Sequence, residues 1–430
     1  MMHLHQHLIA LVVLAVVLPA QDLTEAAKPP EYWPGTKWET VDPAVVGLDA
    51  TKLAAARKHV FAHKSTSFLV LRKGRIVLEA YGKGGGREVP RGIASATKSM
   101  TSILVGMAID RGKLRMDQSI AAYLPSWQDT DKAAITLRHL LSMTSGLKPL
   151  KKAQRRPPGD QFIHNASMSV EARPGGLWKY NTPAYHMLFR IIETATEMEL
   201  AEWTREHLLA PLGMKGSAWN TRQSGQFTNY FNLSCTARDM GRFGLFVMRG
   251  GRWGDAQLVS KKFFASATTP SQQRNPAYGL LFWLNAKKGH SAGGRRLAYR
   301  FPGAPRDLVA CLGKGGQQIL AIPSQDLVIV RQGDKPADPA FAQRLVRLVL
   351  SSIKGGGFPG EPETGGKPSA KEIMQRFDVD ADDKLSKKEF GASSFGSRRP
   401  KAFAQFDTDG DGFLSVGELA KFVERRRRGR

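Results

Sequence analysis

The sequence lacks any apolar run long enough for a membrane-spanning helix. Its longest such run covers residues 8–18, which is eleven residues, whereas a spanning helix needs roughly 20. The run lies at the N-terminus and ends in Pro19-Ala20, a pattern typical of a secretory signal peptide, although no Lys or Arg precedes it. We therefore expect a signal peptide over residues 1–20, an exported (periplasmic or secreted) protein and no transmembrane segment.

Cysteine is scarce, since Cys235 and Cys311 are the only two. Two cysteines exclude a disulfide-based scaffold of the kind that stabilises small secreted domains. In an oxidising compartment they could pair, and they could equally remain buried thiols. The sequence leaves both possibilities open.

Acidic residues are also few, at 38 against 63 Lys and Arg, which gives a net charge of +25. Such a charge favours polyanionic partners in general. No nucleic-acid-binding motif is present, and aromatic residues do not alternate with basic ones, so we expect no specific nucleic-acid partner. The Arg425–Arg428 run indicates a solvated basic tail over residues 425–430.

A chain of 430 residues is long enough for more than one folded unit. Apolar residues follow a helical period from Thr97 to Asp110, and a last amphipathic helix is predicted over residues 340–353. Strand patterns flank this helical middle on both sides, at residues 68–71, 76–78, 308–312, 319–322 and 327–330. The arrangement predicts an α+β fold whose sheet combines distant parts of the chain, with an inserted helical region.

The composition changes abruptly after the last of these helices. Residues 355–369 consist mainly of Gly, Pro and polar residues and can form no core, so they are predicted to be a linker. A small further segment, residues 370–424, follows it.

Ser95 and Lys98 form the pattern S-x-x-K. A serine hydroxyl needs a base within hydrogen-bond distance, and residues three apart share a helix face, so Lys98 can serve if it becomes desolvated and loses its proton. The pattern alone is weak, because 145–148 and 351–354 match it too. The surrounding sequence has to decide between them.

Several segments in the right order resemble class C β-lactamase-like serine hydrolases. The resemblance covers residues 45–354 and implies an antiparallel sheet flanked by helices. The similar segments are Ile135–Leu147 after the S-x-x-K helix, Pro174–Tyr185 around the second motif Y-x-N, Pro211–Met214, Ser234–Met240, and Gly313–Gln317 at the third motif, K-x-G or H-x-G.

The resemblance implies a catalytic role for each matching residue. Ser95 would attack a carbonyl and form an acyl-enzyme, while Lys98 and Tyr180 share the proton transfers. Lys314 would supply positive potential and orient an anionic substrate group. The backbone N–H groups of Ser95 and Gln317 would form an oxyanion hole, in which one donor contributes about 2.7–4 kcal/mol.

One residue departs from the family pattern, since Thr182 stands where Y-x-N has asparagine. A hydroxyl offers fewer hydrogen bonds than an amide, so contacts to a peptide or β-lactam amide would be poorer. This favours an ester or simple amide as substrate, as in 6-aminohexanoate-dimer hydrolases and esterases. The alternatives are a β-lactamase or D-amino-acid peptidase like the penicillin-binding proteins, and a catalytically silent binding protein on the same fold.

Two acidic loops in the last segment match the EF-hand pattern and predict a small all-α pair that binds Ca²⁺ through oxygen ligands. Position 6, where glycine allows a sharp turn, is Asp383 in the first loop and Gly412 in the second. The ligands predicted for the first loop are Asp378, Asp380, Asp382, the Lys384 carbonyl and Glu389, and those for the second are Asp407, Asp409, Asp411, the Phe413 carbonyl and Glu418.

Other patterns lead to ordinary structural interpretations. His59 and His63 stand four residues apart but have no evident third metal ligand, so we expect a solvated helix face. The glycine-rich stretch at 82–86 is expected to be a loop, because no G-K-[ST] follows it. The motifs G-x-S-x-G and H-E-x-x-H are absent, which argues against an α/β-hydrolase and a zincin.

Overall fold

The computed structural model describes residues 31–355, except for 152–153, 155–158, 292, 294–295 and 298, and beyond them residues 370, 373–374, 384–387, 390 and 403–428. The expected signal peptide and residues 356–369 of the expected linker lie outside this part. No helix among the described residues is both long and apolar enough to span a membrane.

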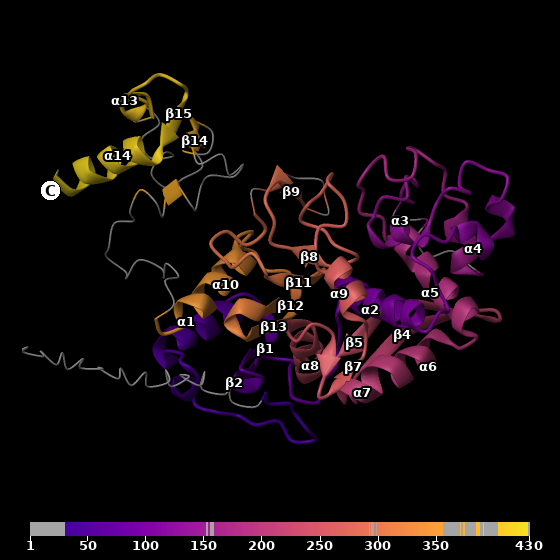
Figure 1. The fold of residues 1–430 in the computed structure, drawn as a ribbon. Helices are drawn as coiled ribbons and strands as arrows, with labels where there is room; N and C mark the ends of the chain where they lie inside the picture. The colour runs from indigo at the N-terminus through magenta and orange to yellow at the C-terminus, as the bar shows by residue number, and fades with distance from the viewer. Residues whose placement is uncertain are drawn as a thin grey trace, which may run out of the picture. The chain divides into compact units, whose positions relative to one another are not determined.

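A six-stranded antiparallel sheet combines the beginning and the end of the main unit, as expected (Figure 1). Strands from residues 65–81 pair directly with strands from residues 309–333, since Phe68 lies opposite Arg331 and Val70 opposite Ile329. In sheet order the strands are β2 (Arg75–Tyr81), β1 (Ser65–Arg72), β13 (Leu327–Gly333), β12 (Gln317–Ile322), β11 (Val309–Gly313) and β8 (Trp283–Leu284).

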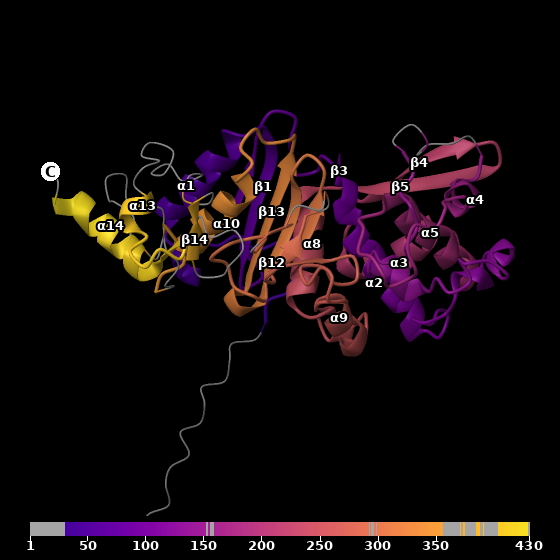
Figure 2. The same ribbon diagram turned by 90° about the horizontal axis from the view of Figure 1, so that it is seen from above.

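Helices cover both faces of this sheet (Figure 2). Helices α1 (Ala50–Phe61) and α10 (Phe341–Ser351) pack together on one face, and α8 (Ala237–Met248) lies on the other against β1, β12 and β13. A Cβ atom on Gly244 would lie 2.4 Å from Val328 Cγ1, so glycine lets α8 approach the sheet closely.

The ends of this unit meet, because Leu48 forms a bridge with Ile353 and the Lys354 N–H donates to the Gly47 carbonyl.

A helical region with a long hairpin extends from the sheet on the side of α8 (Figure 2). Its first helix, α2 (Thr97–Asp110), is the one predicted from periodicity, and every residue from Thr97 to Ala108 is buried. The others are α3 (Leu137–Leu141), α4 (Gln161–Ala166), α5 (Thr182–Thr196), α6 (Leu200–Thr204), the π-helical turn Arg205–Leu209, α7 (Ala210–Leu212) and α9 (Lys261–Ala267), with the hairpin strands β4 (Ala218–Ser224) and β5 (Phe227–Cys235).

Short elements complete the main unit. The strands are β3 (Arg91–Gly92), β6 (Arg252–Trp253), β7 (Ala256–Gln257), β9 (Gly289–His290) and β10 (Arg296–Leu297), and the 3₁₀ turns are Pro43–Val46, Ala94–Ala96, Ile120–Ala122, Pro125–Trp127 and Pro323–Gln325.

The predicted solvated face at His59 is wrong. The His59 ring is buried, stacks on Phe341 at 4.9 Å between centroids, and its Nε2 lies 3.2 Å from the Phe341 carbonyl. Helix α10 covers this part of α1, a contact that local sequence does not reveal.

The C-terminal unit has a core of its own, which includes Leu385, Phe390, Phe403 and Leu414. Two short strands, one from each predicted EF-hand loop, pair with Leu385 opposite Leu414. Its described elements are β14 (Lys384–Ser386), α13 (Phe403–Phe406), β15 (Phe413–Ser415) and α14 (Val416–Arg428).

Candidate active site

Ser95 lies in a strained turn at the start of α2. The residue before it, Ala94, has φ of +49°, a left-handed conformation that is unfavourable for a residue with a Cβ atom and that clusters at functional sites. Ser95 is half-buried, whereas every residue from Ala96 to Ala108 is buried. The turn therefore keeps the hydroxyl at the edge of the core.

Lys98 is buried beneath this turn, with 3% of its surface exposed. Its Nζ atom lies 3.3 Å from Ser95 Oγ and 3.3 Å from Thr182 Oγ1. The same Nζ is 4.2 Å from the centroid of the Tyr185 ring and 5.1 Å from that of Tyr180. Hydroxyls and ring faces thus surround a lysine that is withdrawn from solvent.

Thr182, which stands where the motif Y-x-N has asparagine, reaches Lys98 because of how α5 begins. Asn181 caps this helix, since its side chain accepts from the Ala184 N–H and donates to the Leu147 carbonyl. Thr182 is the first helical residue and directs its hydroxyl to Lys98. The amide of Asn181, one residue before Thr182, therefore stabilises the start of the helix.

Tyr180 completes the cluster. Burial raises the pKa of Tyr180 to about 12, while a hydrogen bond with Ser95 and the charge of Arg300 act in the opposite direction. The ring stacks on Trp283 at 5.8 Å between centroids, and the Arg300 guanidinium lies 3.8 Å from the Trp283 centroid. Tyr180 is therefore a neutral phenol at neutral pH.

Arg300 was not anticipated from the sequence. It comes from the segment between β10 and β11, where no motif marks it, and only the fold brings it to Trp283 and Tyr180. Its charge acts on Tyr180, which is the effect that the family resemblance had led us to expect of Lys314.

Lys314 and Gln317 lie at the hairpin between β11 and β12. A Cβ atom on Gly313 would lie 2.1 Å from the Ile93 carbonyl oxygen, so the hairpin begins against the segment that leads to Ser95. Lys314 is exposed, and among the described residues no hydrogen bond or ion pair joins it to Ser95, Lys98 or Tyr180. The Gln317 side chain is buried and donates to the Gly333 carbonyl at 2.6 Å.

The two competing S-x-x-K matches lack this arrangement. Ser145 is buried and its hydroxyl accepts from the Leu147 N–H, while the Ser351 hydroxyl donates to the Leu348 carbonyl. The lysines of both patterns, Lys148 and Lys354, are exposed. In the described part of the chain, the lysine of an S-x-x-K match contacts its serine at Ser95 alone.

The second EF-hand loop gathers carboxylates as a calcium site requires. One carboxylate oxygen from each of Asp407, Asp409 and Glu418 lies within 4.8 Å of the others. Asp407 Oδ1 is buried and has no hydrogen-bond partner among the described residues, which suits an oxygen that ligates a cation. Gly412 has φ of +81°, the turn for which glycine was expected. These residues fit Ca²⁺.

The predicted ligands of the first loop, apart from Lys384, lie outside the described residues. Lys384 and Phe413 occupy the joining strands, as position 7 of each loop requires. The Lys384 ammonium pairs with Asp411, and this pair holds the pKa of the Asp411 carboxyl below its usual value. Hydrogen bonds from Ser415 lower the pKa of Glu418 to about 2.

Comparisons with known proteins identify the family of the chain. The family described as Beta-lactamase matches residues 54–351, and an EF-hand family matches residues 401–423. A 6-aminohexanoate-dimer hydrolase of Paenarthrobacter ureafaciens is 25% identical over 69% of this chain and 79% of its own length. Esterase EstB of Burkholderia gladioli is 26% identical over 44% of this chain and 57% of its own.

Solved structures show the same fold. A putative beta-lactamase from Bacteroides dorei superposes with a TM-score of 0.58 at 19% identity, over 71% of this chain and 99% of that one. A putative 6-aminohexanoate-dimer hydrolase from Bacillus anthracis gives 0.57 at 20%, over 67% and 78%. Because the family match spans more than half of the chain, the protein belongs to the beta-lactamase family of hydrolases, with an EF hand near its C-terminus.

Proposed function

We propose that the protein is an exported serine hydrolase that cleaves an ester or amide bond through an acyl-enzyme on Ser95. The contact of Lys98 Nζ with Ser95 Oγ, beneath a strained turn, is the observation that supports this most strongly. Neutral Lys98 accepts the hydroxyl proton as Ser95 Oγ forms a bond to the carbonyl carbon. Placing nucleophile and base in contact is what this step requires.

Tyr180 supplies the proton to the leaving group. With a pKa of about 12 it stays protonated at neutral pH, so it suits the role of general acid better than that of base. As the tetrahedral adduct collapses, the bond to the leaving oxygen or nitrogen breaks and that atom takes the phenol proton, which Lys98 then replaces. Water next attacks the acyl ester and gives a proton to Lys98. As the bond between the acyl carbon and Ser95 Oγ breaks, Lys98 returns that proton to Ser95 Oγ.

The negative charge on the carbonyl oxygen needs fixed donors. The backbone N–H of Ser95 is one, and the hairpin that begins at Gly313 supplies the second, for which Gln317 N–H is the donor proposed from sequence. The Gln317 side chain is occupied with Gly333, and this leaves the role of its backbone unaffected. Two such donors are commonly the largest catalytic contribution.

An ester or a simple amide is the preferred substrate class. Thr182 gives the site a hydroxyl in place of an amide that could both donate and accept. The names of two relatives, a 6-aminohexanoate-dimer hydrolase and an esterase, agree with this preference. Arg300, which lies 3.8 Å from the Trp283 centroid, is placed to attract an anionic group of the substrate, a role also proposed for Lys314.

The EF-hand unit serves structure or attachment through bound calcium. The S-x-x-K chemistry needs no metal, and a ligand stabilises the unit whose folded state holds it. Asp407, Asp409, Glu418, Asp411 and the Phe413 carbonyl would hold the ion, which supplies charge compensation for the clustered carboxylates.

A substrate panel tests the proposed function. The purified chain is offered a p-nitrophenyl ester, a linear amide, a D-amino-acid dipeptide and a β-lactam, with Ser95→Ala as the control. We expect turnover of the ester or the amide that Ser95→Ala abolishes. Faster hydrolysis of the β-lactam or the D-peptide would favour the penicillin-binding-protein alternative, and no turnover at all would favour the silent binding protein.

A further inference from the structure

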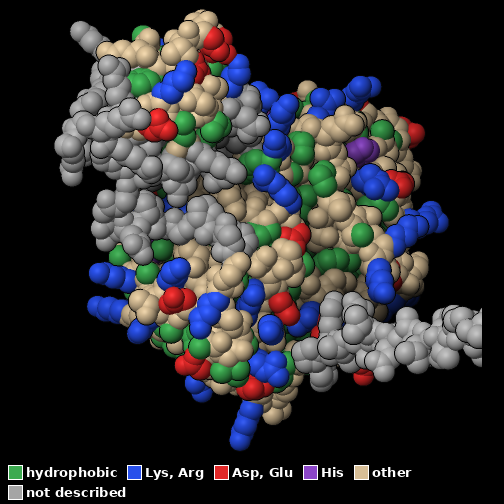
Figure 3. Space-filling model, turned by 60° about the vertical axis from the view of Figure 1, so that its left-hand side comes forward, with side chains coloured by type: hydrophobic (Ala, Val, Ile, Leu, Met, Phe, Trp, Pro, Cys, Tyr) green, Lys and Arg blue, Asp and Glu red, His purple; other side chains and the backbone are tan. Residues whose placement is uncertain are grey.

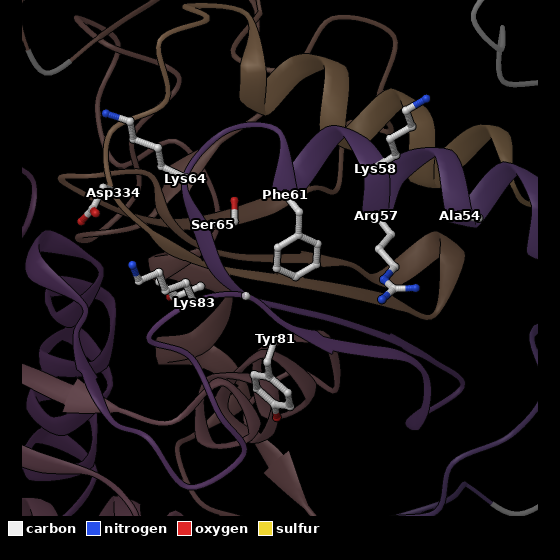
Figure 4. Close-up of a pocket in the computed structure, with 11 residues that line it drawn as sticks. Ala54, Arg57, Lys58, Phe61, Lys64, Ser65, Tyr81, Lys83 and Asp334 are labelled. Atoms are coloured by element: carbon white, nitrogen blue, oxygen red, sulfur yellow. The ribbon is translucent and has the colours of Figure 1, made fainter.

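A basic groove lies apart from the catalytic cluster, between α1 and the ends of β1 and β2. It has a volume of about 710 Å³, and its lining includes Arg57, Lys58, Phe61, Lys64, Tyr81 and Lys83, but none of Ser95, Lys98 and Tyr180. Figure 4 shows Arg57 on one side of the Phe61 and Tyr81 rings and Lys64 and Lys83 on the other, while the Lys58 ammonium points away from the rings.

Helical spacing and glycines bring these side chains together. On α1, Phe61 follows Arg57 by four residues and Lys58 by three, so each of these two cations neighbours Phe61 on the helix surface. The glycine-rich loop after β2 packs directly on the start of β1, because a Cβ atom on Gly82 would lie 2.7 Å from the Ser65 carbonyl oxygen and one on Gly85 only 1.8 Å from that of Thr66.

This close packing places Lys83 in the groove, opposite α1. The glycine-rich stretch at 82–86, which fits no nucleotide-binding pattern, thus has a structural role in shaping the groove.

The four cations of the groove have no acidic partner in the part of the chain that the structure describes. Among the described residues, no carboxylate lies within ion-pair distance of Arg57, Lys58, Lys64 or Lys83. Asp334 also lines the groove. Its carboxylate pairs with Arg91, a residue outside the groove, at 3.6 Å between Oδ1 and Nη2.

Glu79 is close to the groove, because its side chain accepts a hydrogen bond from the Tyr81 hydroxyl. Its charge is compensated elsewhere, by two 2.7 Å hydrogen bonds from Arg238 and by Arg87 at 3.8 Å. The groove therefore keeps a strong positive charge. A cleft lined by charge of one sign concentrates counter-ions.

We infer that this groove binds a ligand that carries two or more phosphate groups. Four cations around one cavity match a compact, dense negative charge, and a phosphate ester carries about −1.5 to −2 at neutral pH. Arg57 can contact phosphate oxygens in a bidentate manner, the lysines add point charges, and Phe61 offers a ring to an adjoining apolar part. The site is separate from the hydrolytic one.

Calorimetry with inorganic tripolyphosphate and with long-chain polyphosphate tests this inference on the full chain. The test variant is Lys58→Glu/Lys83→Glu. The matched control is Lys52→Glu/Lys113→Glu, which changes the net charge equally at exposed lysines outside the groove, one of them on α1. Circular dichroism and ester hydrolysis establish that both variants are folded.

We expect saturable binding that weakens at least about tenfold in the groove variant, as for loss of charge-assisted contacts, and changes less than about twofold in the control. Binding of tripolyphosphate would indicate a free phosphorylated compound as the source, and binding of the long chain alone a phosphate-bearing polymer. Equal weakening in both variants would overturn the inference, because general charge would then explain binding. Absence of binding would overturn it too.

Discussion

The hydroxyl of Thr182 can be removed with little change of shape, since valine has the same branched form. In the proposed mechanism this hydroxyl positions Lys98, whose Nζ lies 3.3 Å from it and 3.3 Å from Ser95 Oγ. Thr182→Val therefore takes a hydroxyl partner away from a lysine that has 3% of its surface exposed. We expect slower acylation with little change in substrate binding.

The size of the effect follows from the geometry. Lys98 becomes charged as it accepts the Ser95 proton, and a hydrogen bond to a charged group contributes about 1.5–3 kcal/mol. The 3.3 Å separation is longer than the roughly 2.8 Å of a strong charge-assisted bond, so the lower end applies, about 1.5 kcal/mol. Because about 1.4 kcal/mol corresponds to tenfold in rate, kcat/KM should fall about tenfold, mostly through kcat.

Steady-state hydrolysis of a p-nitrophenyl ester measures this fall. Thr196→Val is the matched control, because Thr196 is also buried and ends the same helix, with its hydroxyl bonded to the Ile192 carbonyl. Thr182→Asn should retain activity and shift preference toward amides. Our reasoning is refuted if Thr182→Val keeps kcat/KM within about twofold of the wild type, or if Thr196→Val loses as much.

Three further predictions concern ionisable groups. Burial raises the pKa of Cys235 and of Cys311 to about 12, so neither free thiol should react with a disulfide reagent at pH 8 before unfolding; rapid reaction in the native state would contradict this. Burial raises the pKa of Tyr180 to about 12. The stability that its neutral form contributes is therefore complete below about pH 10 and is lost as the pH rises toward 12. Ester hydrolysis should show no descending limb below pH 10 while circular dichroism reports a folded chain. Calcium should bind with a Kd of about 10⁻⁴–10⁻³ M or tighter and raise the melting temperature of the EF-hand unit, and Glu418→Gln should weaken binding measured by calorimetry; loss of most hydrolysis on chelation would contradict the separate role given to calcium.

Much of the fold could be predicted because local patterns determine it. The apolar period over Thr97–Asp110 corresponds to a helix with the same bounds, and the strand patterns near residues 68 and 328 became neighbours in one sheet. His59 shows the limit of such reasoning. Its burial depends on α10, which lies far along the chain. The helix around His59 was therefore predicted correctly, but the exposure of the His59 side chain was not.

The candidate site also contains contacts that local sequence predicts and contacts that only the fold creates. Ser95 and Lys98 stand three residues apart at the start of a predicted helix, and their contact agrees with that expectation. The same spacing at Ser145 and Ser351 gives no such contact, so the surrounding sequence was needed to choose between the three. Arg300 reaches Tyr180 only through the folded path between β10 and β11, and no residue type or spacing announces such a contact. Lys314 illustrates the converse, because a motif position gives the place in a hairpin but not the direction of a long side chain. Its role stays a prediction.

Covalent labelling with a fluorophosphonate, followed by mass spectrometry of the digested chain, tests most directly whether Ser95 is the nucleophile. We predict one adduct, on the peptide that contains Ser95, and its complete loss in Ser95→Ala. Ser145→Ala and Ser351→Ala should label and turn over substrate as the wild type does. An adduct on Ser145 or Ser351, or labelling that persists in Ser95→Ala, would contradict the proposed mechanism.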